Sequence, residues 1–367
     1  MATGENEITV RTPGGTYGVV VERDVLRRTG EELDRVAAGR PWAVITDRVV
    51  WRHWGQAFEA AVAPRTFSLV RLPPGEEQKR IATAEYVFEQ LVKLRLDRTA
   101  LIIGFGGGVI GDLAGFVASV FLRGVAFANI PTTLLAQIDS SVGGKTGVNL
   151  AGGKNLVGTF YQPRRVLADP EVLRTLPARE LRAGLYEAIK CGVLKRPLFD
   201  FIERERAGLL AKDPDSLAEL VRRSIEVKAW VVSRDEREAG LRRVLNLGHT
   251  IGHALEAETG YSYFLHGEAV AWGLRAITLI AEQRGFLPSR DAERIHALVR
   301  SLGGLPPLVR ISPRRLAHRL LADKKTLGGV VHFVIPARIG KVQVVTGIDT
   351  AAVVDALDRL RKESAAG

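Results

Sequence analysis

The stretch ALIIGFGGGVIGDLAGFVASV, residues 100–120, passes from a short apolar run through clustered glycines into a longer run with helical character. Gly106, Gly108 and Gly111 fit the spacing G-x-G-x-x-G, in which glycine lets the backbone approach a pyrophosphate at a helix N-terminus. The stretch therefore predicts a strand, a tight turn and a helix that together bind a dinucleotide. A glycine-packed turn without a ligand stays as the alternative.

The acid that normally follows this motif by about twenty residues is missing, because Asp139 is the first acidic residue after Asp112. The ribose of a dinucleotide would then need a carboxylate from another strand end. Asp47 ends the apolar run AVITD, and we expect it to serve the ribose.

Short β-rich runs at 16–22, 41–47, 100–108 and 125–133 alternate with helical patterns in the first half of the chain. Such alternation predicts a parallel sheet that is covered by helices. From about residue 178 the pattern is mostly helical, and Pro177 can open the first of these helices. We therefore expect an α/β N-terminal domain over 1–177 and a mostly α-helical domain over 178–367, with a late hairpin at 330–347.

The bulk composition is ordinary for a globular protein of 367 residues, with 46% hydrophobic and 25% charged residues. Cys191 is the single cysteine, so no internal disulfide can form and we expect a reducing cytoplasm. The polar start of the chain shows no secretory pattern, and Asp112 and Arg123 interrupt the longest apolar stretch, so we expect no membrane span. The net charge of +11 suits anionic small substrates, and no basic motif interleaved with aromatics favours nucleic acid.

Residues 130–163 are rich in glycine and small polar side chains, with Lys145 and Lys154 among them. Lysines among hydroxyl groups suit a phosphorylated substrate. The segment VGGKT resembles part of a P-loop, but Asp139 stands where the leading glycine belongs, which disfavours nucleotide triphosphate hydrolysis. A long surface loop is the alternative interpretation.

The stretch NLGHTIGHALE, residues 246–256, places His249 and His253 four residues apart, on one face of a predicted helix. Thr250 occupies the position where a metalloprotease motif needs glutamate. His266 follows soon after, and Glu187 lies in an apolar helical stretch where a carboxylate needs a partner. Two histidines and a carboxylate would form a zinc site with open positions. A helix hairpin with hydrogen-bonded histidines is the alternative.

Taken together, these motifs resemble the 3-dehydroquinate synthases, in the sugar phosphate cyclase family. The similarity runs in order from LPPGEEQK at 72–79, through IPTTLLAQIDSSVGGKTGVN at 130–149 and LNLGHTIGHALE at 245–256, to DKK at 323–325. The resemblance implies an NAD- and metal-dependent enzyme of the shikimate pathway, which leads to chorismate and the aromatic amino acids. Such an enzyme converts 3-deoxy-D-arabino-heptulosonate 7-phosphate to 3-dehydroquinate and phosphate, a carbon–oxygen lyase reaction followed by ring closure.

The resemblance also implies one divalent ion, zinc or cobalt, held by Glu187, His249 and His266. This set replaces the pair His249 and His253 that the spacing alone suggests, and His253 would face the substrate. The implied NAD contacts, added to Asp47 from the reasoning above, are Glu76, Lys79, Gly107, Gly108, Val109, Asp112, Thr132, Thr133, Asp139 and Lys154. The first domain would thus be a Rossmann-like dinucleotide-binding domain, and the second would bind metal and substrate.

The substrate carries a carboxylate and a phosphate, which need several cations around them. Arg123 would reach the phosphate in the neighbouring subunit of a homodimer. The resemblance places around the substrate Lys145, Lys154, Asn155, Lys190, Lys228, Arg242, Asn246, His253 and Lys324 or Lys325. Among these, the residues expected to act in catalysis are Lys145, Lys190, Lys228, Arg242, Asn246 and His253.

Two positions depart from the family pattern: Val49 replaces a polar residue after Asp47, and Tyr186 replaces a smaller residue before Glu187. Related cyclases, such as 2-deoxy-scyllo-inosose synthase and the valiolone-type synthases, act on substrates without a carboxylate. Polyol dehydrogenases share the architecture more distantly and would release NADH. The dehydroquinate interpretation is favoured by the set Lys228, Arg242, Asn246 and His253, which fits a carboxylate-bearing substrate.

Overall fold

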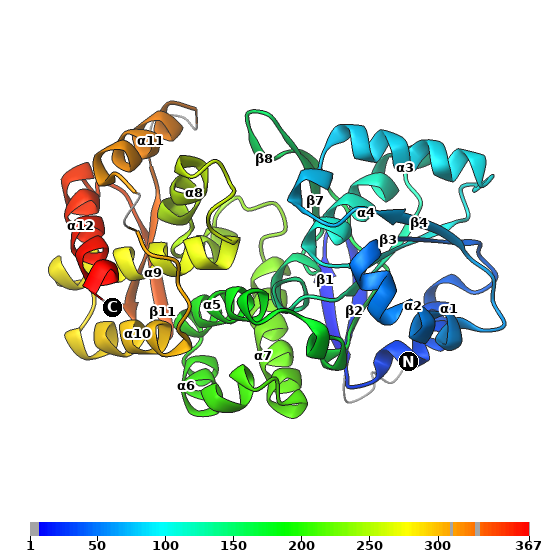
Figure 1. Cartoon of the computed structure of the whole chain (residues 1–367), viewed down its shortest axis with the longest axis horizontal. Helices are drawn as coiled ribbons and strands as arrows, with labels where there is room; N and C mark the ends of the chain where they lie inside the picture. The colour runs from blue at the N-terminus through cyan, green and yellow to red at the C-terminus, as the bar shows by residue number, and fades with distance from the viewer. Residues whose placement is uncertain (1–6, 309–310, 327–330, 367) are drawn as a thin grey trace. The chain divides into compact units, whose positions relative to one another are not determined.

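The computed structural model describes residues 7–308, 311–326 and 331–366, except for the side chains of 318, 321–326 and 366 (Figure 1). The chain divides into two compact units. The first unit contains the chain up to Pro177 together with Lys212–Arg237, and the second contains Ala178–Ala211 and the chain from Glu238 onward. The change after Pro177 falls where the sequence pattern becomes helical.

A seven-stranded sheet forms the centre of the first unit, in the order β1-β2-β9-β6-β5-β3-β4. The first two strands form an antiparallel hairpin, and the other neighbouring strands run parallel. Parallel neighbours need crossover connections, so helices cover the sheet. The strands are β1 (Glu7–Thr12), β2 (Gly15–Val21), β3 (Trp42–Asp47), β4 (Ser68–Leu72), β5 (Leu101–Gly106), β6 (Ala126–Pro131) and β9 (Arg165–Ala168).

Each face of this sheet carries its own buried core, because successive side chains of a strand point to opposite faces. On β5, Leu101 and Ile103 pack with residues of the helices on one face, whereas Ile102 packs with those on the other. Figure 1 shows helix α3 above β3 and β4, and helix α1 below them. The helices are α1 (Thr29–Ala37), α2 (Arg48–Val62), α3 (Ile81–Lys93) and α4 (Gly108–Val120).

Helix α4 packs closely on the central strands because glycines face it there. A Cβ on Gly111 would lie 2.8 Å from Nδ2 of Asn129 on β6. A Cβ on Gly104 of β5 would lie 3.1 Å from the Cβ of Ala114. Two of the glycines in this stretch therefore serve helix–strand packing, whatever the turn between them binds.

The segment between β6 and β9 is not an open loop. It forms a π-helical turn, Ala136–Ser140, and an antiparallel hairpin of β7 (Lys145–Leu150) and β8 (Gly153–Phe160). The surface-loop alternative is therefore wrong for most of this segment. Helix α7 (Pro214–Val232) also belongs to the first unit and packs against β1 and the π-helical turn. The remaining short helices of this unit are η1 (Val25–Arg28), η2 (Glu76–Gln78), η3 (Phe121–Arg123) and η5 (Pro170–Thr175).

Helix α9 (His266–Gln283) is the core of the second unit, since every residue from 267 to 281 is buried. Helices α5, α8, α10 and α12 all pack against it. The hairpin predicted near the end of the chain is confirmed, and so is the expected α/β plus helical fold class. The other elements are α5 (Ala178–Leu194), α6 (Arg196–Leu210), η6 (Leu241–Asn246), α8 (His249–Glu258), α10 (Ser289–Leu302), α11 (Pro313–Thr326), β10 (Phe333–Arg338), β11 (Lys341–Val345) and α12 (Thr350–Ala366).

Among the described helices, none combines the length and the apolar character needed to cross a membrane.

Candidate dinucleotide and metal sites

The glycine turn lies at the carboxyl end of β5, next to the end of β6. The N–H of Thr132 donates to the carbonyl of Gly106 at 2.9 Å, which ties the two strand ends together. Gly107 precedes α4, and no side chain in the described part of the chain caps that helix, so its amino end can receive an anion. A Cβ on Gly108 would lie 3.1 Å from Ser140 Oγ, so any larger residue there would have to displace the Ser140 side chain slightly.

Lys79 and Asp112 form a buried ion pair beside this turn. Lys79 Nζ donates to Asp112 Oδ2 at 2.5 Å, and both side chains are less than one-fifth exposed. Burial raises the pKa of Asp112, and the charge and hydrogen bond of Lys79 oppose that shift. The segment that carries Glu76 and Lys79 is fixed to β7 by Asn149. Asn149 Nδ2 donates to Glu76 Oε1 at 2.8 Å, and Asn149 N donates to Lys79 O at 2.7 Å.

Asp139 and Lys228 also pair, and they connect the π-helical turn to α7. Lys228 Nζ donates to Asp139 Oδ1 at 2.7 Å and also to the backbone carbonyl of Asp139. Near this turn, Thr133 Oγ1 accepts from Ala136 N at 3.2 Å, whereas the buried Thr132 Oγ1 has no hydrogen-bond partner among the described residues. A hydroxyl of that kind has an unused capacity for a ligand.

Asp47 caps helix α2: its Oδ1 accepts from Val49 N at 2.8 Å and from Val50 N at 2.9 Å. This carboxylate therefore caps a helix, a role that was not predicted from the sequence. It would have to keep these two hydrogen bonds while it binds a ribose. The side chain of Val49, the departure from the family pattern, is 41% exposed and adds no polar group at this strand end.

The hairpin β7–β8 separates the two lysines that the sequence grouped together. Lys145 pairs with Phe160 at the base of the hairpin, whereas Lys154 lies next to Gly153 at its turn, roughly 15 Å away along the strands. Asn155 follows with a positive φ of 56°, and its N–H donates to Asn149 Oδ1 at 2.9 Å. The two lysines are therefore not neighbours on this hairpin, and this separation was not evident from the sequence.

Arg123 lies in a strained segment at the end of α4. Leu122 and Arg123 have φ values of 49° and 68°, and Gly124 follows with 113°. Consecutive non-glycine residues in this region cost free energy and persist where the surrounding structure or a function demands them. Val120 and Leu122 beside it are 46% and 39% exposed.

In the second unit, Glu187, His249 and His266 come from three helices and converge. Glu187 Oε1 on α5 lies 3.6 Å from His249 Nε2 on α8 and 3.5 Å from His266 Nε2 on α9. The Glu187 side chain is 1% exposed, and among the described residues no donor is aligned for a hydrogen bond to either of its oxygens. A buried carboxylate that faces two imidazole nitrogens in this way is typical of a divalent metal site.

The other ring nitrogens fix the tautomers of these two histidines. His249 Nδ1 lies 3.2 Å from the carbonyl of Leu247, and His266 Nδ1 lies 3.0 Å from Glu256 Oε2. Both partners are acceptors, so both Nδ1 atoms donate and both Nε2 atoms present lone pairs toward Glu187. The donor set therefore fits a divalent cation, with Nε2 ligands supported from behind.

The charges around this cluster differ between the two histidines. Burial lowers the pKa of His249 well below its usual value, and the positive charge of Lys190 acts in the same direction. Burial alone would lower the pKa of His266 as well, but the hydrogen bond to Glu256 and the charge of Glu187 raise it. Lys190 Nζ lies 2.7 Å from Glu187 Oε2, so a cation already contacts the carboxylate on its second oxygen.

His253 is the exposed member of this group. Its ring centroid lies 5.3 Å from that of His249 and 5.7 Å from that of His266, and ligand nitrogens of the three rings lie within 4.8 Å of one another. The geometry alone thus permits either three histidines, or Glu187 with His249 and His266, as the ligand set.

Two further predicted residues lie just before α8. Arg242, in η6, is buried, and Asn246 Nδ2 donates to Glu238 Oε1 at 2.6 Å. Lys324 falls on the last turns of α11, where its side chain and that of Lys325 lie outside the described part of the structure.

Comparison with known proteins decides the family. The family model described as 3-dehydroquinate synthase N-terminal matches residues 69–183, and that described as 3-dehydroquinate synthase C-terminal matches residues 184–326. The chain belongs to the 3-dehydroquinate synthase family. It is 48% identical to the 3-dehydroquinate synthase of Koribacter versatilis over 99% of this chain and 100% of that protein. It is 46% identical to the enzyme of Solibacter usitatus, over 95% and 97%.

Solved structures related to the 3-dehydroquinate synthase family share the whole fold. The 2-epi-5-epi-valiolone synthase of Streptomyces hygroscopicus, solved with NAD+ and Zn2+, has a TM-score of 0.86 at 29% identity, over 95% of this chain and 97% of that one. A 2-deoxy-scyllo-inosose synthase, solved with carbaglucose-6-phosphate, NAD+ and Co2+, has a TM-score of 0.85 at 26% identity, over 96% and 99%. The resemblance drawn from the motifs is therefore confirmed.

Within this 3-dehydroquinate synthase frame, sequence reasoning missed the buried Glu256 and the glutamate that holds Asn246. Glu256 lies three residues after His253 on α8, within the motif NLGHTIGHALE. This helical spacing would have predicted that Glu256 lies on the same side of the helix as His253. Tyr186, noted as a departure, is buried, and its hydroxyl donates to the carbonyl of Gly303 at 2.5 Å. Burial raises the pKa of this phenol, so it remains a donor.

Proposed function

We propose that this chain is a 3-dehydroquinate synthase, which converts 3-deoxy-D-arabino-heptulosonate 7-phosphate to 3-dehydroquinate and phosphate. The observation that carries the proposal is the full-length similarity to enzymes of that name, at 48% identity over the whole of one relative. The buried cluster of Glu187, His249 and His266 supports it, since this chemistry needs a metal.

We assign NAD to the first domain, residues 1–177. NAD bound there would supply reversible hydride transfer with the substrate within one turnover. The uncapped amino end of α4 would receive the pyrophosphate, and the Lys79–Asp112 pair would hold the adjoining loop in place. The residues proposed to contact NAD are Asp47, Glu76, Lys79, Gly107, Gly108, Val109, Asp112, Thr132, Thr133, Asp139 and Lys154.

We assign the metal to the second domain, residues 178–367, with Glu187, His249 and His266 as its ligands. Zinc or cobalt held by these residues would supply Lewis-acid polarisation of the substrate hydroxyl that is to be oxidised. Glu256 keeps His266 in the tautomer whose Nε2 faces the ion site. His253 is left outside the ligand set, and its exposed ring can exchange a proton with the substrate.

The cationic side chains would bind the two anionic groups of the substrate and orient it. Asn246, which Glu238 already holds in one orientation, would contribute a fixed hydrogen bond. From the first unit the proposed substrate contacts are Arg123, Lys145, Asn155 and Lys228. From the second unit they are Lys190, Arg242, Asn246, His253 and Lys324.

We further propose a cytoplasmic homodimer in which Arg123 serves the active site of the neighbouring subunit. The strained backbone at Leu122 and Arg123, just beyond the end of α4, supports this, because such backbone persists where a function demands it. The exposed apolar side chains of Val120 and Leu122 give a partner chain a surface to cover there.

The test is an assay of the purified protein with the seven-carbon phosphate substrate, zinc and NAD at less than the protein concentration. Phosphate and dehydroquinate should appear in equal amounts, without net NADH, and a chelator should stop the reaction. Glu187→Gln should abolish turnover, whereas Glu180→Gln, on the same helix, should not. Net NADH from a polyol would instead indicate a dehydrogenase.

The structural neighbours make one alternative concrete. One of them was solved with carbaglucose-6-phosphate, and glucose 6-phosphate and sedoheptulose 7-phosphate are sugar phosphates that likewise lack the carboxylate. If the protein consumed either of these sugar phosphates in preference to the heptulosonate, it would still be a sugar phosphate cyclase, but with a different substrate. That result would refute the assignment of Lys228, Arg242 and Asn246 to a carboxylate.

A further inference from the structure

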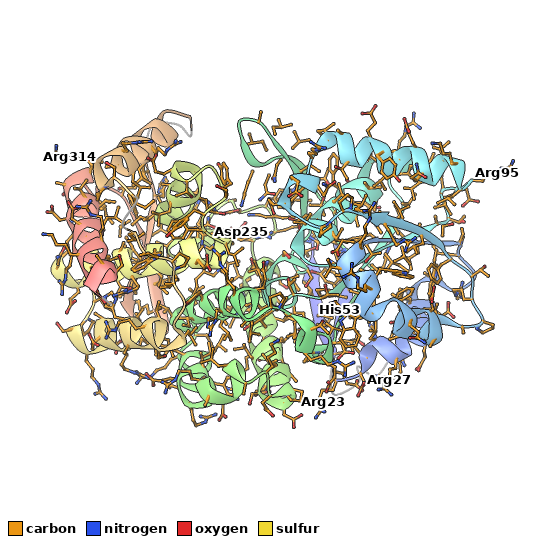
Figure 2. All side chains as sticks on the ribbon, viewed as in Figure 1. Arg23, Arg27, His53, Arg95, Asp235 and Arg314 are labelled. Carbon is orange, nitrogen blue, oxygen red and sulfur yellow. The ribbon has the colours of Figure 1, made fainter. Side chains whose placement is uncertain are left out.

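We propose that Glu236 is a positioning residue for Lys145, a role that rests on the proposed function, in which Lys145 contacts the substrate. Glu236 lies in the segment that follows α7, where Figure 2 labels its neighbour Asp235. Its side chain is buried, and it accepts from Gly14 N at 3.1 Å and from Gln162 Nε2 at 2.6 Å. The carboxylate therefore joins three segments of the first unit that are far apart in the sequence.

The carboxylate of Glu236 fixes the orientation of the Gln162 amide. An ionised carboxylate can only accept, so Gln162 presents its nitrogen to Glu236, and a hydrogen bond to a charged acceptor is stronger than one between neutral groups. The face of this amide packs on Gly144, because a Cβ there would lie 2.5 Å from Gln162 Nε2, 2.6 Å from Cδ and 2.8 Å from Oε1. The amide cannot move away from Gly144 without straining its bond to Glu236.

Gly143 and Gly144 form the buried turn that leads into β7. Their φ values of 98° and 66° lie in the left-handed region, which glycine adopts without steric cost. Consecutive glycines have few conformational restraints of their own, so the contacts around them decide the path of the backbone. Gly143 N donates to the phenol oxygen of Tyr17 on β2 at 2.9 Å, and Gly144 O accepts from Tyr161 N at 2.7 Å. The packed amide of Gln162 completes this set.

Lys145 is the residue after this turn, and it begins β7 with its side chain exposed. A lysine side chain is long and flexible, so the backbone from which it leaves decides where its ammonium group can reach. Glu236 acts on that backbone through Gln162 and Gly144. The alternative is that Glu236 only stabilises the first unit, by joining the turn between β1 and β2 to Gln162.

A double-mutant cycle of Glu236→Ala and Lys145→Ala separates the two roles. The quantity measured is kcat/KM for the heptulosonate, with saturating NAD and zinc, at a temperature where every variant is folded. We expect Glu236→Ala to lower kcat/KM by about 100-fold, a loss that a displacement of roughly 1 Å can cause. The same substitution should cost little once Lys145 is absent. Glu236→Gln should lose much less, because Gln162 can turn its amide and accept from the new one while Gly14 N keeps an acceptor.

Glu32→Ala is the matched control, because Glu32 is another buried carboxylate of the first unit and pairs with Arg165. It should lower the Tm and leave kcat/KM unchanged. Amide hydrogen exchange gives a second measurement, which needs neither substrate nor turnover. The peptide 141–147 should exchange faster in Glu236→Ala than in the parent, whereas Glu32→Ala should leave its exchange as in the parent.

Two results would overturn the proposal: losses of kcat/KM that add in the cycle, or exchange of the peptide 141–147 that Glu236→Ala leaves unchanged. If Lys145→Ala has too little turnover for the cycle, the exchange result decides. A parent that releases no phosphate from the heptulosonate would refute the proposed enzyme function separately. Faster exchange in Glu236→Ala would then still show that Glu236 holds the turn before Lys145.

Discussion

Glu256 on α8 and His266 at the start of α9 form a buried hydrogen bond, with 3.0 Å between Oε2 and Nδ1. The same imidazole turns its Nε2 toward Glu187 Oε1, 3.5 Å away. A carboxylate behind a metal-binding histidine fixes the ring and raises its basicity as a ligand. Glu256 is therefore a positioning residue for the proposed metal site, although it does not face that site itself.

Replacing Glu256 should weaken metal binding without removing a ligand. We expect Glu256→Ala to lower zinc affinity by about 10- to 100-fold, and Glu256→Gln to lower it less, since an amide oxygen can still accept from Nδ1. Competition with a chromogenic zinc chelator measures this directly. Glu258→Gln is the matched control on the same helix, because Glu258 pairs with Arg315 and Arg319. If Glu256→Ala bound zinc as tightly as the parent, the positioning role would be refuted.

Metal addition should stabilise the protein through Glu187. Zinc at 100 times its dissociation constant should raise the free energy of unfolding by about 2.7 kcal/mol, seen as a higher Tm. Glu187→Gln should show no such rise, whereas Glu180→Gln should keep it. A rise that survives Glu187→Gln but is lost in His253→Ala would instead show that the three histidines hold the ion.

The sequence predicted part of this site and not the rest, for a physical reason. Spacing of four on one helix placed His249 and His253 together, and their rings do lie 5.3 Å apart. Helical periodicity carries no information about contacts between helices that are distant in sequence. The apolar surroundings of Glu187 indicated that its carboxylate needs a partner, but the choice of His249 and His266 as those partners came from the family resemblance.

The fold shows the same limit. Apolar runs and glycine turns predicted the central parallel strands, because those strands are buried on both faces. The hairpin β7–β8 was missed, since its glycine-rich, polar sequence lacks a strand pattern and depends on pairing with its neighbour. The capping role of Asp47 was also missed, although an acid just before a helix is a recognised N-terminal signal.

Subunit sharing by Arg123 can be tested by mixing two inactive variants. If Arg123 serves the neighbouring site, a heterodimer of Arg123→Ala and Glu187→Gln chains contains one complete site. Random exchange of subunits would then restore about a quarter of the parental activity. If Arg123 acted within its own subunit, both sites of the heterodimer would be incomplete and the mixture would stay inactive. Light scattering under the same conditions reports whether dimers form at all.

His296 makes the stability of the second unit depend on pH. This buried side chain accepts a hydrogen bond from Arg275 Nε at 3.4 Å, and Arg275 also pairs with Glu363 at 2.7 Å. Burial, and then the charge of Arg275, lower the pKa of His296 to about 4, against 6.5 for an unperturbed histidine. At a pH between these two values, His296 is protonated in the unfolded chain but remains neutral in the folded chain. The stabilisation from the neutral imidazole is thus complete above pH 6.5 and is lost as the pH falls toward 4.

The loss amounts to about 3 kcal/mol across that interval. Urea unfolding at pH 7.5 and pH 5 gives the change in the free energy of unfolding on acidification. This change should differ between the parent and His296→Gln. The parent should lose more stability on acidification than the variant, because glutamine can accept from Arg275 but takes up no proton. The same substitution at His53, exposed on α2, should leave the parental pH dependence in place (Figure 2). Equal losses in the parent and in His296→Gln would mean that His296 is protonated in the folded protein, with Arg275 displaced from it.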